Sequence, residues 1–119
     1  MKPIINYKEH CKVRIRNADK SFLKHEVVKL LIMSLSKNKY DYAGIYSEYE
    51  LSNGQIVDVM VDLGSERVMY EIQKEISPLW LETIKIRDLN LEINTIVVPL
   101  KKLSDNLNEL TKQLEEYII

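Results

Sequence analysis

The sequence contains a single cysteine and no long apolar run, and these two absences exclude several classes of protein. One thiol, that of Cys11, cannot form an internal disulfide, so we expect a reducing, cytoplasmic compartment. A run of about 18 apolar residues would be needed for a transmembrane helix, and none is present. The N-terminus also lacks the apolar core of a signal peptide. Zinc would need His10, Cys11 and His25 together with a remote ligand, which is poor spacing for a zinc motif.

Internal repeats, low-complexity tracts and long linkers are also missing. What remains is a chain of 119 residues with 45% hydrophobic and 29% charged side chains, which are the proportions of a soluble globular protein. This length is sufficient for one core without disulfides or metals as staples. We therefore expect a single domain over residues 1–119.

The net charge of -1 conceals an uneven distribution along the chain. Residues 1–39 hold ten Lys and Arg against three acids, whereas residues 40–76 hold two against eight. A basic first third is suited to contact with a polyanion, and an acidic middle is suited to a divalent cation. The alternative is an ordinary solvated charged surface.

The pattern of residue types predicts the elements in order. Residues 1–20 are expected to form a basic N-terminal arm, followed by a helix over about 22–36 with Ser21 as its N-cap. The apolar face of this helix is predicted from helical spacing. Its members are Leu23, Val27, Leu30, Leu31 and Ser34.

Three strands are expected next, over residues 42–51, 55–63 and 67–73, because Asn53-Gly54 and Gly64-Ser65 are strong turn signals. Ser77-Pro78 is typical of a helix start. The apolar residues assigned to that helix are Leu79, Trp80, Ile84 and Leu89. Residues 94–100 form a β-branched run that reads as a buried strand, and a last amphipathic helix covers 104–118. The expected fold class is α/β, with a three-strand antiparallel meander, a parallel fourth strand and helices on both faces of the mixed sheet.

Two acids fall inside neighbouring predicted strands. Asp58 lies in the second strand and Glu71 in the third, although carboxylates are depleted in strands and costly to bury unpaired. If the hairpin aligns their faces, the two carboxylates come within reach of one cation. Oxygen ligands suit Mg²⁺ or Mn²⁺, which usually serve phosphate chemistry. Glu26 on the first helix, or the backbone carbonyl of Ile72, is a candidate third ligand.

The order of elements, with Glu26, Asp58 and Glu71-Ile72-Gln73 placed within it, resembles the PD-(D/E)xK nuclease superfamily. That family has a core of helix, three-strand meander, helix and strand, the restriction-endonuclease-like fold. In size and layout the chain is similar to archaeal Holliday junction resolvases. The resemblance implies a Mg²⁺-dependent (or Mn²⁺-dependent) DNA endonuclease in which Asp58 and Glu71 bind the ion and Glu26 completes or orients the site.

The sequence departs from the family at the position of the catalytic lysine, which is Gln73 here. Glutamine cannot carry positive charge or exchange a proton as an acid or base. Lys74 is expected on the opposite strand face, so Lys85 on the following helix is the predicted substitute. In this interpretation Gln73 positions the attacking water or the phosphate. Phosphate contacts that read no sequence are expected from a basic set consisting of Lys12, Arg14, Arg16 and Lys24.

Each feature also has a plainer interpretation. Asp58 could be a solvated edge-strand acid, Glu71 could pair with a cation across the sheet, and His25 is expected to be merely exposed. The last helix contains a heptad seam, which favours packing on the chain's own sheet over a homodimer contact. The seam consists of Leu103, Leu107, Leu110, Leu114 and Tyr117. The alternatives to a nuclease are a catalytically impaired nucleic-acid-binding protein on the same fold and a small homo-oligomeric interaction protein.

Overall fold

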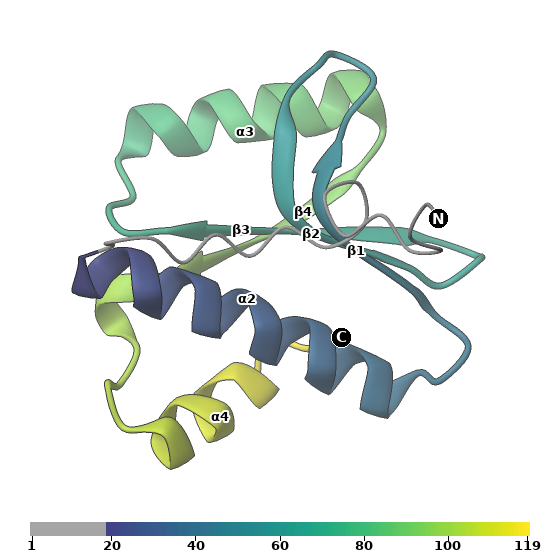
Figure 1. Cartoon of the computed structure of the whole chain (residues 1–119). Coiled ribbons are helices and arrows are strands. Elements are labelled where there is room, and N and C mark those ends of the chain that lie inside the picture. Colours follow the sequence, from purple (N-terminus) through teal and green to yellow (C-terminus); the bar gives the residue numbers. More distant parts are fainter. Residues whose placement is uncertain (1–18) are drawn as a thin grey trace, which may run out of the picture.

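Four strands form one mixed sheet that lies between two layers of helices (Figure 1). The computed structural model describes residues 19–119, so nearly all of the expected N-terminal arm lies outside the described residues. The strands follow the spatial order β1-β2-β3-β4, with antiparallel pairing from β1 to β3 and parallel pairing between β3 and β4. The predicted meander and parallel return are confirmed. The strand bounds are Gly44–Glu50 for β1, Ile56–Asp62 for β2, Arg67–Gln73 for β3 and Asn94–Pro99 for β4.

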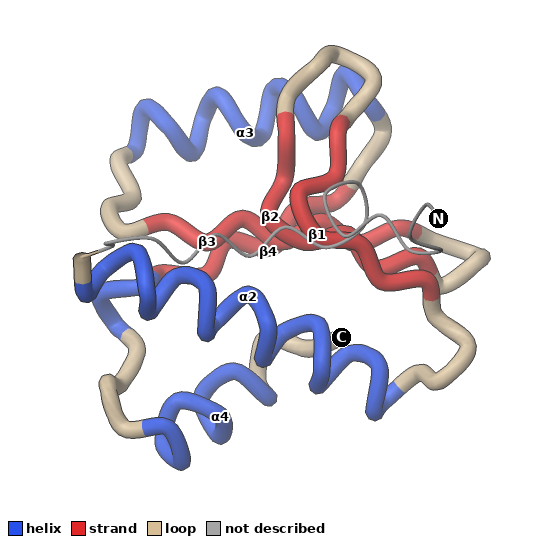
Figure 2. The backbone as a smooth tube through the Cα atoms, viewed as in Figure 1, coloured by secondary structure: helices blue, strands red, loops and turns tan. Residues whose placement is uncertain are grey.

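Helices cover both faces of this sheet, as the sequence predicted (Figure 2). Helices α2 (Lys20–Lys39) and α4 (Leu107–Glu115) lie on one face, and α3 (Pro78–Leu91) lies on the other (Figure 1). Among residues 19–119, no helix is long and apolar enough to cross a bilayer.

The main core lies between the sheet and the α2–α4 layer. It contains Val28 and Ile32 from α2, Leu110 and Leu114 from α4, and inward-facing residues from the sheet, which include Val59, Val61, Val68, Tyr70 and Ile72. A smaller cluster on the α3 side consists of Leu51, Val57, Met60 and Met69. Alternating residues of β2 and β3 thus serve both faces, which fixes the strand register.

The expectations for α2 were wrong in two respects. Its N-cap is Asp19 rather than Ser21, since the Asp19 carboxylate accepts a hydrogen bond from the Phe22 N–H at 2.8 Å. The expected apolar face is largely exposed, with Leu23 and Val27 each 40% accessible. The sheet instead covers the side that carries Val28 and Ile32. Apolar side chains occur all around this helix, so spacing alone does not select the buried side.

Helix α3 begins as predicted, because the Ser77 hydroxyl accepts a hydrogen bond from the Trp80 N–H at 3.1 Å and Pro78 starts the helix. Its buried face does not coincide with these apolar residues. Leu79 and Leu89 are both 80% exposed, and the buried residues of the helix are Ile84 and Arg87. The helix therefore contacts the sheet through a polar network as much as through apolar packing.

Helix α4 is shorter than the expected span 104–118, because Asn106 caps it and a separate 3-10 turn, Leu100–Lys102, precedes it. The seam leucines Leu103, Leu110 and Leu114 are buried in the chain's own core, while Leu107 remains 58% exposed. The favoured interpretation of the seam as intramolecular packing agrees with this arrangement.

Candidate functional site

Strand β2 bends and its ladder is interrupted at Asp58, where pairing with β3 has ended and pairing with β1 skips a single residue. Pairing between β2 and β3 runs only as far as Val59 opposite Tyr70, and one further step of that register would place Asp58 opposite Glu71. Pairing with β1 also skips Asp58, where Glu48 adopts the left-handed conformation with φ of 49°. Beyond the bend the β1–β2 hairpin turns toward α3 (Figure 1). Breaks of this kind in a ladder re-aim side chains and are common beside active sites.

The Asp58 side chain occupies the gap that the bend opens. Its Oδ2 accepts a hydrogen bond of 2.7 Å from the backbone N–H of Ile72, the middle residue of the tripeptide that ends β3. A strand N–H near the core needs an acceptor, and β2 no longer supplies a carbonyl. The carboxylate thus replaces a missing backbone partner.

The other oxygen of Asp58 contacts α2. His25 Nε2 lies 3.3 Å from Asp58 Oδ1, and His25 Nδ1 lies 3.5 Å from Glu26 Oε1. Glu26 Oε2 lies 2.8 Å from Lys29 Nζ, and both of these residues are buried. Four side chains, alternately basic and acidic, therefore link the buried side of α2 to strand β2.

The pKa of His25 is raised above 6.5, first because its ring is hydrogen-bonded to Asp58, while burial opposes the shift. A protonated imidazole can donate from both nitrogens, which matches a carboxylate near each of them. The sequence-based expectation of a merely exposed His25 was wrong, since its side chain is 26% accessible and contacts two acids.

Glu71 is buried, with 8% of its surface accessible. Its pKa is raised from 4.5 to about 7, first because of burial and second because of the nearby Asp58 carboxylate, while Arg87 acts in the opposite direction. Asp58 and Glu71, the two acids predicted to share a site, therefore interact electrostatically. Neutral pH leaves Glu71 only partly ionised.

Arg87 is buried, and its positive charge acts to lower the pKa of Glu71. Its guanidinium donates to Thr95 Oγ1 at 2.9 Å, to Asp88 Oδ1 at 3.3 Å and to Gln55 Oε1 at 3.4 Å. Thr95 in turn donates to Asp88 at 3.0 Å. This network joins α3 to β4 and to the loop before β2, and it partly offsets the charge of Glu71.

The other predicted site residues are more dispersed. Gln73 is half-buried at the end of β3, alongside Pro99 of β4. Lys85 lies on the exposed side of α3, 3.9 Å from Glu82, and Lys24 pairs with Asp105 at 3.0 Å. The remaining predicted phosphate contacts, Lys12, Arg14 and Arg16, lie outside the described residues.

Sequence reasoning missed the roles of His25, Lys29 and Arg87. For Lys29 a signal existed, because its i,i+3 spacing from Glu26 allows a pair on one helix face. Nothing in the sequence marks Arg87 as buried, since that depends on how α3 meets the sheet.

Carboxylate oxygens are suitable ligands for a hard cation, but the described side chains do not form a complete coordination sphere. Within residues 19–119, no three His, Cys, Asp or Glu side chains converge closely enough to hold a metal ion. The carboxylates of Asp58 and Glu71 interact electrostatically at the bend, and carboxylate oxygens are donors that Mg²⁺ and Mn²⁺ use together with waters.

Comparisons of the chain with protein-family models, with curated proteins and with solved structures found no match. Support for a function therefore comes from the residues, the order of elements and the site geometry.

Proposed function

We propose that this protein is a divalent-metal-dependent DNA endonuclease built on the restriction-endonuclease-like core, with branched DNA as a candidate substrate. The order helix, three-strand meander, helix, strand supports this fold assignment. The observation that carries the proposal is the electrostatic coupling of Asp58 and Glu71 at the point where β2 leaves β3. Two acids whose charges oppose each other in a partly buried site are suited to a shared cation.

In this proposal Asp58 and Glu71 hold Mg²⁺ or Mn²⁺, and the ion would polarise the phosphodiester and lower the pKa of an attacking water. Glu26 acts through His25, which contacts both acids and orients Asp58. Gln73 positions the water or the phosphate by hydrogen bonding.

The positive charge that the family's lysine supplies must come from elsewhere. The position of Lys85, paired with Glu82 on the exposed side of α3, does not favour its predicted role as the substitute. His25 lies 3.3 Å from Asp58, and Glu26 contacts both His25 and Lys29. We therefore assign the compensating charge to α2.

A second candidate function is DNA binding without cleavage on the same fold. It is favoured by the combination of Gln73 with a Lys85 that is engaged by Glu82. In either case DNA is the proposed partner, and a homodimer would supply the two sites that cutting both strands requires.

A nicking assay on linear, supercoiled and four-way-junction DNA, with Mg²⁺ or Mn²⁺, tests the proposal. Wild-type protein should nick only with metal, and Asp58→Asn, Asp58→Ala and Glu71→Gln should each lose about 100-fold or more. Asp62→Asn is the matched control, because Asp62 lies on the same strand and pairs with Arg67 at 3.7 Å. Equal rates in wild type and Asp58→Asn would refute the assignment. Salt-dependent DNA binding with no nicking would select the second candidate.

A further inference from the structure

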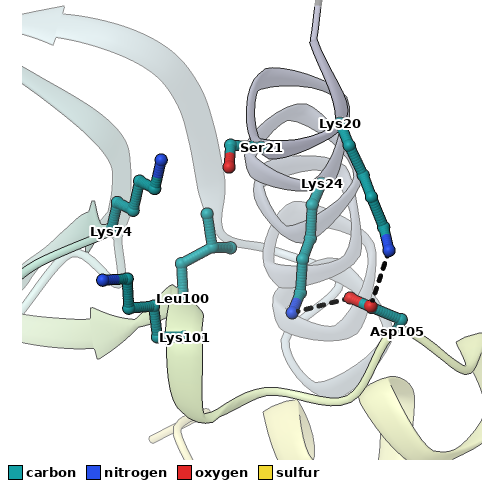
Figure 3. Close-up of a pocket in the computed structure, with 7 residues that line it drawn as sticks. All are labelled: Lys20, Ser21, Lys24, Lys74, Leu100, Lys101 and Asp105. Carbon is teal, nitrogen blue, oxygen red and sulfur yellow. Dashed lines mark ion pairs between the residues drawn. The ribbon is translucent and has the colours of Figure 1, made fainter.

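A lysine-lined pocket opens where the N-terminal end of α2 meets the ends of β3 and β4 (Figure 3). Its volume is about 280 Å³. The lining residues are Lys20, Ser21, Lys24, Lys74, Leu100, Lys101 and Asp105. We call this the lysine pocket.

The lysine pocket carries an excess of positive charge. Its one lining acid, Asp105, lies 3.1 Å from Lys20 and 3.0 Å from Lys24 (Figure 3). Lys101 lies 2.7 Å from Glu75, which is not one of the residues that line the pocket. Four lysines thus exceed two carboxylates, and Lys74 takes part in none of the ion pairs that the described residues form.

The positive charge of the pocket comes from its lysines rather than from the helix end. Helix α2 has no acid in its first turn, but the Asp19 carboxylate caps its N-terminus and offsets the positive end of its dipole. The pocket also adjoins the candidate site, because Lys24 precedes His25 on α2 and Lys74 follows Gln73 on β3.

We propose that the lysine pocket binds a phosphate group of the DNA backbone beside the one that is cut, an inference that rests on the proposed nuclease function. Lysine ammonium groups bind phosphate as point charges, without the directional fork of arginine. The lining contains no arginine and no aromatic ring, so it offers neither bidentate base readout nor a stacking platform. The pocket therefore positions DNA without reading its sequence.

The test measures DNA binding in EDTA, so that metal and cleavage play no part. Anisotropy of a fluorescein-labelled duplex is followed against salt for wild type, Lys74→Gln and Lys112→Gln. Lys112 is an exposed lysine on α4 and gives the same charge change away from the pocket. Lys74→Gln should weaken binding about 3- to 10-fold at low salt and reduce the slope of log K against log salt by about 1. Lys112→Gln should match wild type.

Two further arms identify the source of the phosphate. Inorganic phosphate at constant ionic strength should shift the backbone amide NMR signals of Ser21 and Lys74 in wild type, and the shifts should weaken in Lys101→Gln. Equal affinity for duplexes with and without a 5′-phosphate supports a backbone diester, whereas a preference that Lys74→Gln abolishes would overturn the backbone assignment in favour of a strand end.

Equal salt slopes for wild type, Lys74→Gln and Lys112→Gln would overturn the pocket as a DNA contact. That result leaves the nuclease proposal standing if Asp58→Asn still abolishes nicking. Conversely, a pocket effect in a protein that never nicks DNA would refute catalysis and retain the phosphate site.

Discussion

Glu71 is a carboxyl group that the fold holds partly protonated near neutral pH. Its pKa of about 7 arises first from burial and then from the charge of Asp58. In the proposed function, a proton and a divalent cation would therefore compete for the same oxygens. The side chain is also a source of instability for the fold when nothing is bound.

Replacing Glu71 by glutamine should stabilise the protein at alkaline pH. The folded protein holds the Glu71 proton more tightly than the unfolded chain, so the cost of ionisation grows as pH rises from about 4.5 to about 7 and is complete above it. We expect Glu71→Gln to raise the free energy of unfolding by about 1–3 kcal/mol at about pH 8 and to change it little at about pH 4. Urea unfolding at both pH values checks this, with the exposed Glu82→Gln as control. A gain that is the same at both pH values would contradict it.

The contact between His25 and Asp58 predicts a second pH effect of the same sign, because the folded-state pKa of His25 is also raised. Because the folded pKa of His25 is raised, its protonated form stabilises the fold below about pH 6.5, and this contribution is lost as pH rises through the folded pKa. Asp58→Asn removes the main cause of the shift, so the NMR titration midpoint of His25 should fall. His25→Gln identifies the signal. An unchanged midpoint in Asp58→Asn would show that the contact is absent in solution.

Among the elements, α2 depends on a cap that its sequence did not make obvious. Asp19→Ala should lower the free energy of unfolding by about 1 kcal/mol, since the Phe22 N–H loses its acceptor. Ser21→Ala, at the position expected from sequence to be the cap, should cost much less. Urea unfolding of the two variants decides between the caps, and a larger loss in Ser21→Ala would reverse the assignment.

Local chemistry allowed the elements to be predicted, but not which of their faces are buried. Asn53-Gly54 and Ser77-Pro78 determine backbone conformation within a few residues, so the strands and the start of α3 were placed correctly. The buried side of α2 depends on how a helix with apolar residues all around docks on the sheet. The burial of Arg87 depends on partners from three separate segments. Asp58 and Glu71 were predictable because acids are rare in strand interiors.

For α4, two leucines of one seam should respond differently to truncation. Leu114 is fully buried and Leu107 is 58% exposed. Leu114→Ala should destabilise the fold by about 2–5 kcal/mol, and Leu107→Ala by less than about 0.5 kcal/mol. Thermal melting measures both. Sedimentation of Leu107→Ser tests the homodimer separately. If Leu107 packs between two chains, this substitution should weaken dimerisation without lowering the stability of the fold.

At the scale of the whole molecule, the fold brings α2 against strands from the acidic middle of the chain. Lys29 and His25 of α2 meet Glu26 and the strand acid Asp58, and the lysine pocket opens beside them. In the proposed function, the lysines of the pocket would hold a phosphate while Asp58 and Glu71 hold the metal ion.

Metal binding should couple to the stability of the entire domain and to pH. At about 100 times its dissociation constant, Mg²⁺ or Mn²⁺ would stabilise the fold by about 2.7 kcal/mol. The rise in melting temperature should be larger at about pH 8 than at about pH 6, because Glu71 must lose its proton to bind the ion. Asp58→Asn should abolish the rise, and NaCl at equal ionic strength controls for screening. A rise that is independent of pH would place the ion elsewhere.

The bond from the Ile72 N–H to Asp58 has an evolutionary consequence. If the proposed cleavage were lost in a descendant, Glu71 and Gln73 could change, yet position 58 would remain under selection to keep an acceptor for the Ile72 N–H. An aspartate conserved there among future homologues would testify to architecture as much as to catalysis. Substitution at position 71 would therefore be a better indicator than substitution at position 58 that the proposed activity had been gained or lost.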